Sequence, residues 1–252
     1  MKLMEKTESK LSQYEFVKGV PKNIVRIPTF LSGDFGRDFL DEYQGRAQTD
    51  YKNADVLNIL RTDKDIVKGS NPYAVVLANK ILRQEGLRTA TPADVERILK
   101  SGDLALGGVY IDTALVLRNE DEPNKYLAGD LIKQLGKKKL PVMIPLAGLD
   151  LRVDSNAPME LAFNIREDAQ VIYDKILNSE NENFNSEDIN EKTGLPKKLG
   201  KGNRAFYTRD SGLSGFCLGR DSFLDSGNGY LDYSVDDGRV VVTDAEGIAR
   251  KN

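Results

Sequence analysis

Two apolar runs stand out from the alternation of hydrophobic and polar positions along the chain. They cover residues 104–117 and 140–151, and the segment between them has Leu127, Leu131 and Leu135 at the spacing of one helix face. Each run is long enough to cross the interior of a sheet, so the pattern predicts a central β-α-β unit. A crossover helix of this kind usually joins parallel strands. An antiparallel pair with the helix on one face fits the same pattern.

Two helices are predicted before the central unit. Asn71-Pro72 and Thr91-Pro92 each put a favoured N-cap residue directly before a proline at the first helical position. Apolar residues then recur at helical spacing in both segments. We expect a helical hairpin over residues 72–101. Its linker, residues 86–90, is longer than the turn of a DNA-binding helix-turn-helix, so the pair is interpreted as packing helices.

The pattern before this hairpin is weaker. Residues 11–17 contain scattered apolar positions that fit a short helix, and residues 23–30 are rich in β-branched side chains. Residues 34–44 place aromatic and leucine side chains on one helical face. A short helix, a strand and a longer helix are therefore expected in this order.

Strand-like sequence prevails after the second apolar run. Residues 149–153 and 159–165 flank a polar turn and predict a pair of strands. Residues 179–203 are rich in Asn, Glu and Ser, which is typical of a surface loop. Asp237-Gly238 lies between two β-branched segments and predicts a hairpin over residues 231–243.

These elements predict an α+β fold with a mixed sheet, a helical N-terminal region and a β-rich C-terminal portion. The expected organisation is an α/β body over residues 1–178, the polar loop over residues 179–203, and the β-rich portion over residues 204–252. A piece of roughly 50 residues without a disulfide or a metal is only marginally stable by itself. The C-terminal portion is therefore expected to pack on the body.

Composition places the chain among soluble globular proteins. Of its 252 residues, 40% are hydrophobic and 30% are charged, and no apolar run approaches the ~18 residues of a membrane-spanning helix. The first ten residues contain no apolar signal segment. A cytoplasmic protein that does not enter a membrane is expected. The net charge of −3 disfavours general nucleic-acid binding, which depends on neutralising phosphates.

The chain has no histidine and a single cysteine, Cys217. This excludes Ser-His-Asp and Cys-His catalysis, histidine-ligated metals and an internal disulfide. Ser214 lies in a glycine-flanked segment that falls short of the nucleophile-elbow pattern. Cys217 stands between two apolar residues, as a buried thiol does. Any catalysis would have to use carboxylates, Lys, Arg, Tyr, Ser or Thr, the lone thiol or an oxygen-bound metal.

A basic loop follows the polar stretch. Residues 200–205 have the letters of the Gly-x-Gly-x-x-Ala fingerprint, but the preceding strand and the following helix of a dinucleotide site are missing. Four cations of this loop could hold an anion together with free backbone N–H groups: Lys197, Lys198, Lys201 and Arg204. Phe206-Tyr207 could stack on a base. The loop is interpreted as solvated, or alternatively as a contact for phosphate or for nucleic acid.

Acidic residues follow both apolar runs. Glu120 comes after the first run, and Asp150 and Asp154 come at the end of the second and just after it. If the two strands are parallel, these carboxylates meet at the crevice beyond the strand ends, where open α/β sheets bind ligands. Oxygen ligands there would suit Mg²⁺ or Mn²⁺. The alternative is that Glu120 simply stands near a helix N-terminus, where the helix dipole favours acids.

A non-catalytic binding or assembly module is the leading functional hypothesis, because no complete catalytic constellation can be assembled from these residues. One alternative is a Mg²⁺- or Mn²⁺-dependent enzyme acting on a phosphorylated or nucleotide substrate, with Lys201, Arg204 or Arg220 holding the phosphate. Another is a local nucleic-acid contact through residues 197–207. The expected partner is a protein or a phosphate-bearing small molecule, and the sequence identifies no cofactor.

Overall fold

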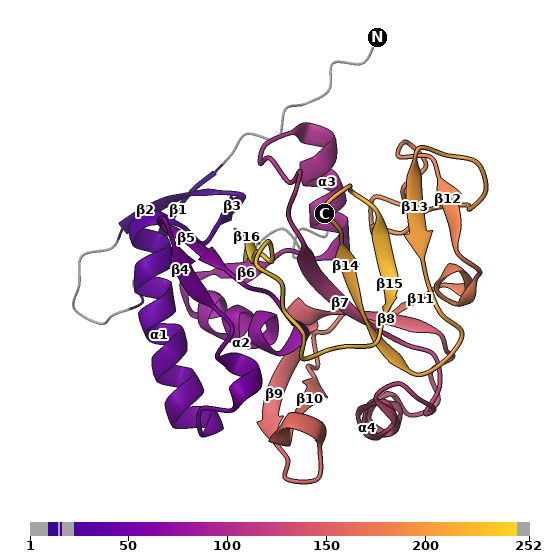
Figure 1. Cartoon of the computed structure of the whole chain (residues 1–252), viewed down its shortest axis with the longest axis horizontal. Coiled ribbons are helices and arrows are strands. Elements are labelled where there is room, and N and C mark those ends of the chain that lie inside the picture. The colour runs from indigo at the N-terminus through magenta and orange to yellow at the C-terminus, as the bar shows by residue number, and fades with distance from the viewer. Residues whose placement is uncertain (1–9, 15, 17–22, 246–252) are drawn as a thin grey trace.

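The computed structural model of the chain describes residues 10–14, 16 and 23–245 (Figure 1). The α-helices are α1 (Gly33–Tyr51), α2 (Pro72–Leu82), α3 (Pro92–Ser101) and α4 (Lys125–Leu135). The strands are β1 (Lys10–Tyr14), β2 (Asn23–Ile27), β3 (Thr29–Phe30), β4 (Arg61–Asp63), β5 (Ile66–Lys68), β6 (Leu87–Thr89), β7 (Ile111–Leu117), β8 (Val142–Pro145), β9 (Leu149–Val153), β10 (Leu161–Ile165), β11 (Ile172–Tyr173), β12 (Glu182–Phe184), β13 (Arg204–Tyr207), β14 (Leu213–Leu218), β15 (Leu224–Asn228) and β16 (Val241–Asp244). Short 3-10 helices cover Asp55–Leu57, Arg83–Glu85, Leu146–Gly148, Pro158–Glu160 and Lys175–Asn178.

A seven-stranded sheet forms the centre of the molecule, in the order β11-β8-β7-β14-β15-β13-β12. Neighbouring strands are antiparallel except β13 and β15, which are parallel. The predicted α+β fold with a mixed sheet is therefore confirmed. The remaining strands form small sheets, one of which joins β3, β16 and β6.

The two apolar runs lie side by side, as predicted. β7 and β8 are paired, and α4 connects them. Their pairing is antiparallel, with Leu117 opposite Val142 and Ala114 opposite Pro145. The residues that follow β7 therefore lie at the opposite end of the pair from those that follow β8. This excludes the parallel alternative and the common strand-end crevice that depends on it.

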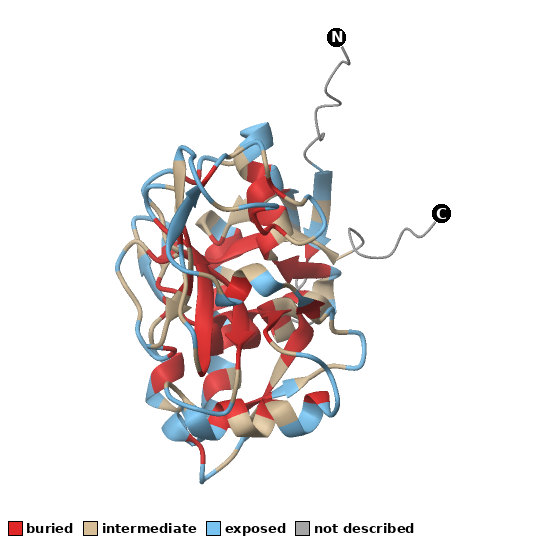
Figure 2. Ribbon diagram, turned by 90° about the vertical axis from the view of Figure 1, so that its right-hand side faces the viewer, coloured by how far each residue is buried: buried red, intermediate tan, exposed pale blue. Residues whose placement is uncertain are grey.

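Both faces of the central strands are buried, because each face meets a different hydrophobic cluster (Figure 2). Leu115, Leu117 and Ile144 pack with the apolar faces of α2 and α4. Val116 and Met143 point to the other side, where they meet α3. Burying such a side chain stabilises the fold by roughly 1.5–3 kcal/mol. Because both faces of these strands are covered, apolar residues follow one another without alternation, and the sequence shows a continuous apolar run.

The two helices before the central unit begin as predicted. The Asn71 side chain accepts a hydrogen bond from the backbone N–H of Ala74, and Thr91 forms a reciprocal capping box with Asp94. Strand β6 lies between the helices, however, and their buried side chains belong to different clusters. They pack on separate parts of the molecule rather than against each other as a hairpin.

The C-terminal portion, which was expected to pack on the body, contributes strands to the main sheet. β14 pairs with β7, and β15 and β13 continue the sheet from there. The segment 179–203 is also part of this layer, because it contains β12 and the buried side chains of Phe184 and Leu195. β9 and β10 form the predicted strand pair.

The hairpin predicted over residues 231–243 is wrong. Residues 229–240, which we call the strap, cross from the end of β15 to β16 without strand pairing to each other. Gly238 accepts a hydrogen bond from the Gly69 N–H at 2.9 Å, and Ser234 Oγ accepts one from the Ser70 N–H at 3.0 Å. Leu231, within the strap, has a buried side chain. The local turn forms, with the Gly238 N–H donating to the Val235 carbonyl at 2.9 Å, but contacts with residues distant in sequence replace the strand pairing.

The N-terminal part also differs from the prediction. Lys10–Tyr14 forms strand β1, paired with β2, where a short helix was expected. The end of that predicted helix, Val17, lies outside the described residues, as do the first nine residues on which the targeting prediction depends. The helix predicted over 34–44 extends to Tyr51. Within the described part of the chain, no helix combines the length and apolar character needed to cross a membrane.

Candidate functional site

A pocket of about 360 Å³ opens between the strap and the turn that joins β14 to β15, residues 219–223. This volume lies at the small end of the range for ligand sites, roughly 300–1,000 Å³. Four aromatic side chains contribute to its lining: Tyr110, Phe223, Tyr230 and Tyr233. Arg220, Asp221, Asn228 and Asp237 add polar groups. Aromatic walls with a few polar groups are the usual composition of a site for a small organic ligand.

Backbone hydrogen bonds bring the strap to the pocket. Tyr110, just before β7, donates its N–H to the carbonyl of Asp237 at 3.1 Å, and its own carbonyl accepts from the Arg239 N–H at 2.9 Å. On the other side, the Gly108 N–H donates to the carbonyl of Arg220 at 3.1 Å. The segment before β7 is therefore fixed to both the strap and the β14–β15 turn.

The wall formed by Tyr110 is held from behind by a buried polar network. The Tyr110 hydroxyl donates to Asp112 Oδ1 at 3.0 Å and accepts from Asn228 Nδ2 at 3.1 Å. Ser70 Oγ donates to Asp112 Oδ2 at 2.6 Å. Asn228 Oδ1 accepts from the Tyr230 N–H at 3.1 Å. These bonds fix Tyr110 and the first residues of the strap before any ligand arrives.

Asp112 is the acid at the centre of this network, and its carboxyl is buried. Burial disfavours the charged form and raises the pKa of Asp112 to about 6, although hydrogen bonds from Ser70 and Tyr110 oppose the rise. The nearby carboxyl of Asp225 adds to it. The network therefore contains a carboxyl that gains or loses its proton close to neutral pH.

Phe223 forms a second wall, and its ring packs directly against the backbone of Gly219. A Cβ atom placed on Gly219 would stand 2.0 Å from the Phe223 ring, so only glycine leaves room for this ring. On its other side the ring makes an edge contact with Tyr207, with centroids 5.3 Å apart. The position of Phe223 is thus set by Gly219 and Tyr207 together.

The remaining aromatic and charged groups are open to solvent, except Asp237. The exposed fractions of Tyr230 and Tyr233 are 75% and 62%. Arg220 is hydrogen-bonded through Nε to Asp237 Oδ2, and the side chains of this pair are 62% and 16% exposed. Asp237 Oδ1 is buried and has no hydrogen-bond partner among the described residues. Because this oxygen is closed off from solvent, it is not available to a ligand in the pocket as the pair now stands.

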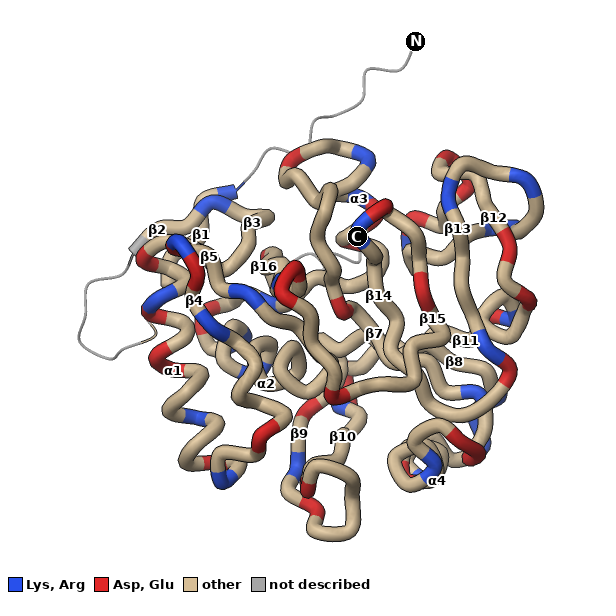
Figure 3. The backbone as a smooth tube through the Cα atoms, viewed as in Figure 1, with Lys and Arg blue, Asp and Glu red and all other residues tan. Residues whose placement is uncertain are grey.

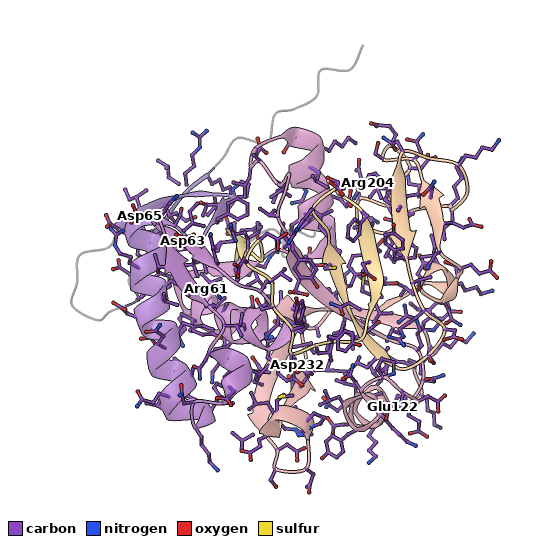
Figure 4. The ribbon with its side chains drawn as sticks, in the orientation of Figure 1. Arg61, Asp63, Asp65, Glu122, Arg204 and Asp232 are labelled. Atoms are coloured by element: carbon purple, nitrogen blue, oxygen red, sulfur yellow. The ribbon has the colours of Figure 1, made fainter. Side chains whose placement is uncertain are left out.

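The predicted basic loop does not form one cluster of free cations. Arg204 turns inward and forms a two-pronged ion pair with Glu96 of α3, at 2.6 and 2.7 Å (Figure 4). Its guanidinium also lies over the Phe184 ring. Lys197, Lys198 and Lys201 are exposed, and Lys198 is 3.5 Å from Asp188. Of the proposed stacking pair, Phe206 is buried, and only Tyr207 reaches the surface.

The predicted metal ligands are separated and engaged with other groups. Glu120 is exposed near the start of α4. Asp150 pairs with Arg83 at 2.7 Å, and Asp154 accepts from the Tyr126 hydroxyl at 2.9 Å and pairs with Arg152 at 3.1 Å.

Figure 3 shows both signs of charge along β9, far from β12 and β13, which flank the basic loop. Across the residues that the structure describes, no three His, Cys, Asp or Glu side chains are grouped to hold a metal ion.

The two candidate nucleophiles are both buried. Ser214 Oγ accepts a hydrogen bond from Arg118 at 2.8 Å and donates one to the Ser226 carbonyl at 2.5 Å. Burial raises the pKa of the Cys217 thiol well above its usual range, which keeps it neutral. Arg220, the cation closest to this thiol in the sequence, is paired with Asp237.

Of the residues selected from the sequence, only Arg220 lines the pocket. The aromatic walls were missed because the tyrosines show no recognisable spacing in the sequence. A weak signal was present in the segment 228–235, where Tyr230 and Tyr233 stand among small and polar residues. Tyrosine in such a setting is rarely needed for a core and is frequent at binding surfaces.

Comparisons of the chain with protein-family models, with curated proteins and with solved structures give no match. The function therefore has to be inferred from the chemistry of the residues that line the pocket.

Proposed function

We propose that this protein is a non-catalytic binding module whose ligand occupies the aromatic pocket between the strap and the β14–β15 turn. The observation that carries this proposal is the combination of fixed aromatic walls, Tyr110 and Phe223, with the exposed polar side chains of Arg220 and Asp221 in one pocket. Aromatic walls with a few well-placed polar groups are typical of small-molecule sites.

The pocket is prepared for binding before the ligand arrives. Tyr110 is fixed through Asp112 and Asn228, and Phe223 is fixed by Gly219 and Tyr207. Ordering side chains on binding costs free energy, about 0.5–1.5 kcal/mol for each flexible side chain. Walls that are already ordered avoid this cost, so even a small contact area can hold a ligand.

The surroundings of the pocket favour binding over catalysis. Ser214 and Cys217 are enclosed by the sheet, and the Asp112 carboxyl lies behind Tyr110 rather than in the pocket. A general base must come within hydrogen-bonding reach of the proton that it removes. The groups that do line the pocket, Arg220 and Asp237, are engaged with each other.

The proposal is tested by screening a chemically mixed set of small molecules for binding to the ¹⁵N-labelled protein by NMR. The set includes sugars, amines, phosphates and short peptides. We expect at least one class to shift the amide signals of residues 219–237 in a saturable way. A screen in which none of these classes shifts them would overturn the proposal, as would turnover of a ligand by the purified protein.

Two glycine variants provide the matched control. Gly219→Ala displaces the Phe223 ring and should weaken binding, because the added Cβ meets that ring. Gly107→Ala adds the same methyl group where nothing lies within 4 Å, and should bind as the unmodified protein does. Equal binding by the two variants would contradict the assignment of the pocket.

The rival metal-dependent enzyme is tested on the same sample. A ligand present at 100 times its dissociation constant stabilises a protein by about 2.7 kcal/mol. Thermal stabilisation by Mg²⁺ or Mn²⁺ with a nucleotide, without any response at residues 219–237, would favour that enzyme over the binding module.

A further inference from the structure

Building on the proposed binding function, we infer that the ligand of the aromatic pocket is a neutral saccharide, either a free sugar or the end of a glycan chain. The inference follows from the charges, the hydrogen-bonding groups and the aromatic surfaces that the pocket presents together.

The charges around the pocket disfavour an anion. Its lining includes one cation, Arg220, and two carboxylates, Asp221 and Asp237, and Arg220 is already paired with Asp237. The charge that remains is the exposed Asp221 carboxylate, which would repel a phosphate. Placing like charges together is a general means of rejecting a ligand. A neutral ligand avoids this penalty, and a cation is compared with it directly in the titration experiment.

The hydrogen-bonding groups call for a ligand that both donates and accepts. The exposed Asp221 carboxylate can only accept, while the guanidinium of Arg220 can only donate. The hydroxyl groups of a sugar do both, and each can turn to suit its neighbour. Several hydroxyls on one ring can therefore serve the carboxylate and the arginine at the same time.

The aromatic rings supply the other half of a sugar site. One face of a pyranose ring is a patch of C–H groups, which packs on the face of a tyrosine. Tyr230 and Tyr233 offer large exposed surfaces on the strap, and Tyr110 and Phe223 form the fixed walls. Tyrosine gives such contacts at a low cost in side-chain entropy.

A proline-rich peptide is the nearest competitor, because aromatic grooves also bind polyproline helices. Proline has no backbone N–H, so such a peptide offers mainly carbonyl acceptors. It would leave the exposed Asp221 carboxylate without a donor. A sugar hydroxyl can donate to this carboxylate, which favours the saccharide.

The experiment titrates the full chain with defined probes and follows the amide signals of residues 219–237. The probes are glucose, galactose, mannose and N-acetylglucosamine with their short oligomers, and, as comparisons, glucose 6-phosphate, choline and a hexaproline peptide. Concentrations reach roughly 10 mM, which reveals even millimolar dissociation constants. A response to monosaccharides identifies a free sugar as sufficient, and a response to oligomers alone identifies a glycan end; either supports the inference.

Variants then assign the contact. Tyr230→Ala and Tyr233→Ala should each weaken sugar binding roughly tenfold, whereas Tyr173→Ala, an exposed tyrosine on β11 at the far edge of the sheet, should not. Both pocket tyrosines are largely exposed, so the fold should tolerate their loss.

The outcomes separate this inference from the proposed function. If residues 219–237 respond only to choline, to the phosphorylated sugar or to the peptide, the saccharide inference is overturned while the binding module stands. If sugar binding is unchanged in both pocket tyrosine variants, the sugar binds elsewhere and the inference fails. If none of the probes shifts these residues, and the wider screen also fails, both are overturned.

Discussion

The hydroxyl of Tyr110 donates a hydrogen bond to Asp112 Oδ1 over 3.0 Å, and this bond joins a wall of the pocket to a carboxyl in the protein interior. Asp112 also accepts from Ser70, the residue before the cap of α2. The shape of the pocket is therefore tied to the junction between the main sheet and α2. A substitution of Tyr110 or of Ser70 should therefore alter the position of the other side chain.

The buried Asp112 carboxyl should make stability depend on pH. Its pKa is about 6 in the folded protein and near 3.8 when unfolded, so the folded state holds the proton more tightly. This tighter proton binding adds to the free energy of unfolding. The contribution is fully present below pH 3.8 and is lost as the pH rises through 6. This difference in pKa corresponds to about 3 kcal/mol.

The test compares the protein with its Asp112→Asn variant by urea unfolding between about pH 4 and pH 7. Relative to the variant, the unmodified protein should lose about 2.4 kcal/mol of unfolding free energy over this interval, which is most of the full effect. Because all other carboxylates are shared, the difference isolates Asp112. A constant difference across the interval would contradict the assigned pKa.

The ion pair between Arg204 and Glu96 should be essential to the packing of α3 on the sheet. Glu96→Gln keeps the shape of the side chain but leaves the Arg204 guanidinium in the interior without its countercharge. Breaking a buried pair by removing one partner costs about 3–5 kcal/mol. Urea unfolding of the variant should show a loss of this size.

Lys198→Ala is the control for this variant, since it removes an exposed cation 3.5 Å from Asp188. Pairs at the surface contribute only about 0–1 kcal/mol. Similar losses in the two variants would show that the Arg204 pair is not buried as described.

Two glycines of α1 should respond in opposite directions to the same substitution. Gly45 is exposed within the helix, and nothing lies within 4 Å of the place that an added methyl group would take, so Gly45→Ala should raise the unfolding free energy by roughly 0.5–1 kcal/mol. Gly36→Ala should lower it, because its Cβ would stand 2.8 Å from the Leu31 carbonyl carbon. Thermal unfolding of both variants measures the difference, and a loss in both would show that Gly45 is not free of contacts.

The Cys217 thiol should be unreactive in the folded protein. It is fully buried, and burial raises the pKa of the thiol, so little thiolate forms at neutral pH. A colourless disulfide reagent that releases a coloured thiol should react slowly with the native chain and rapidly in concentrated urea. Fast reaction without urea would contradict this burial.

The sequence predicted elements well where the deciding contacts are local. The caps at Asn71 and Thr91 form as expected because the side chain bonds to backbone only a few residues away. The prediction failed over residues 231–243 because Gly69 and Tyr110, far away in the chain, bond to the backbone of residues 237–239 that a hairpin would have paired internally. Arg204 was predicted to be a free cation because its partner, Glu96, is 108 residues away, and no local pattern connects the two.

By itself, the sequence determined which segments are buried and which chemistry is absent. The two apolar runs had to form the interior because water excludes them, and the lack of histidine removes whole classes of mechanism whatever the fold. Only the tertiary structure decided the direction of the strands and the position of the pocket. Tyr110 and Asn228 are 118 residues apart, and their contact depends on β14 and β15 joining β7 in one sheet. Periodicity reports how a segment faces the core, but it contains no information about which distant segment lies beside it.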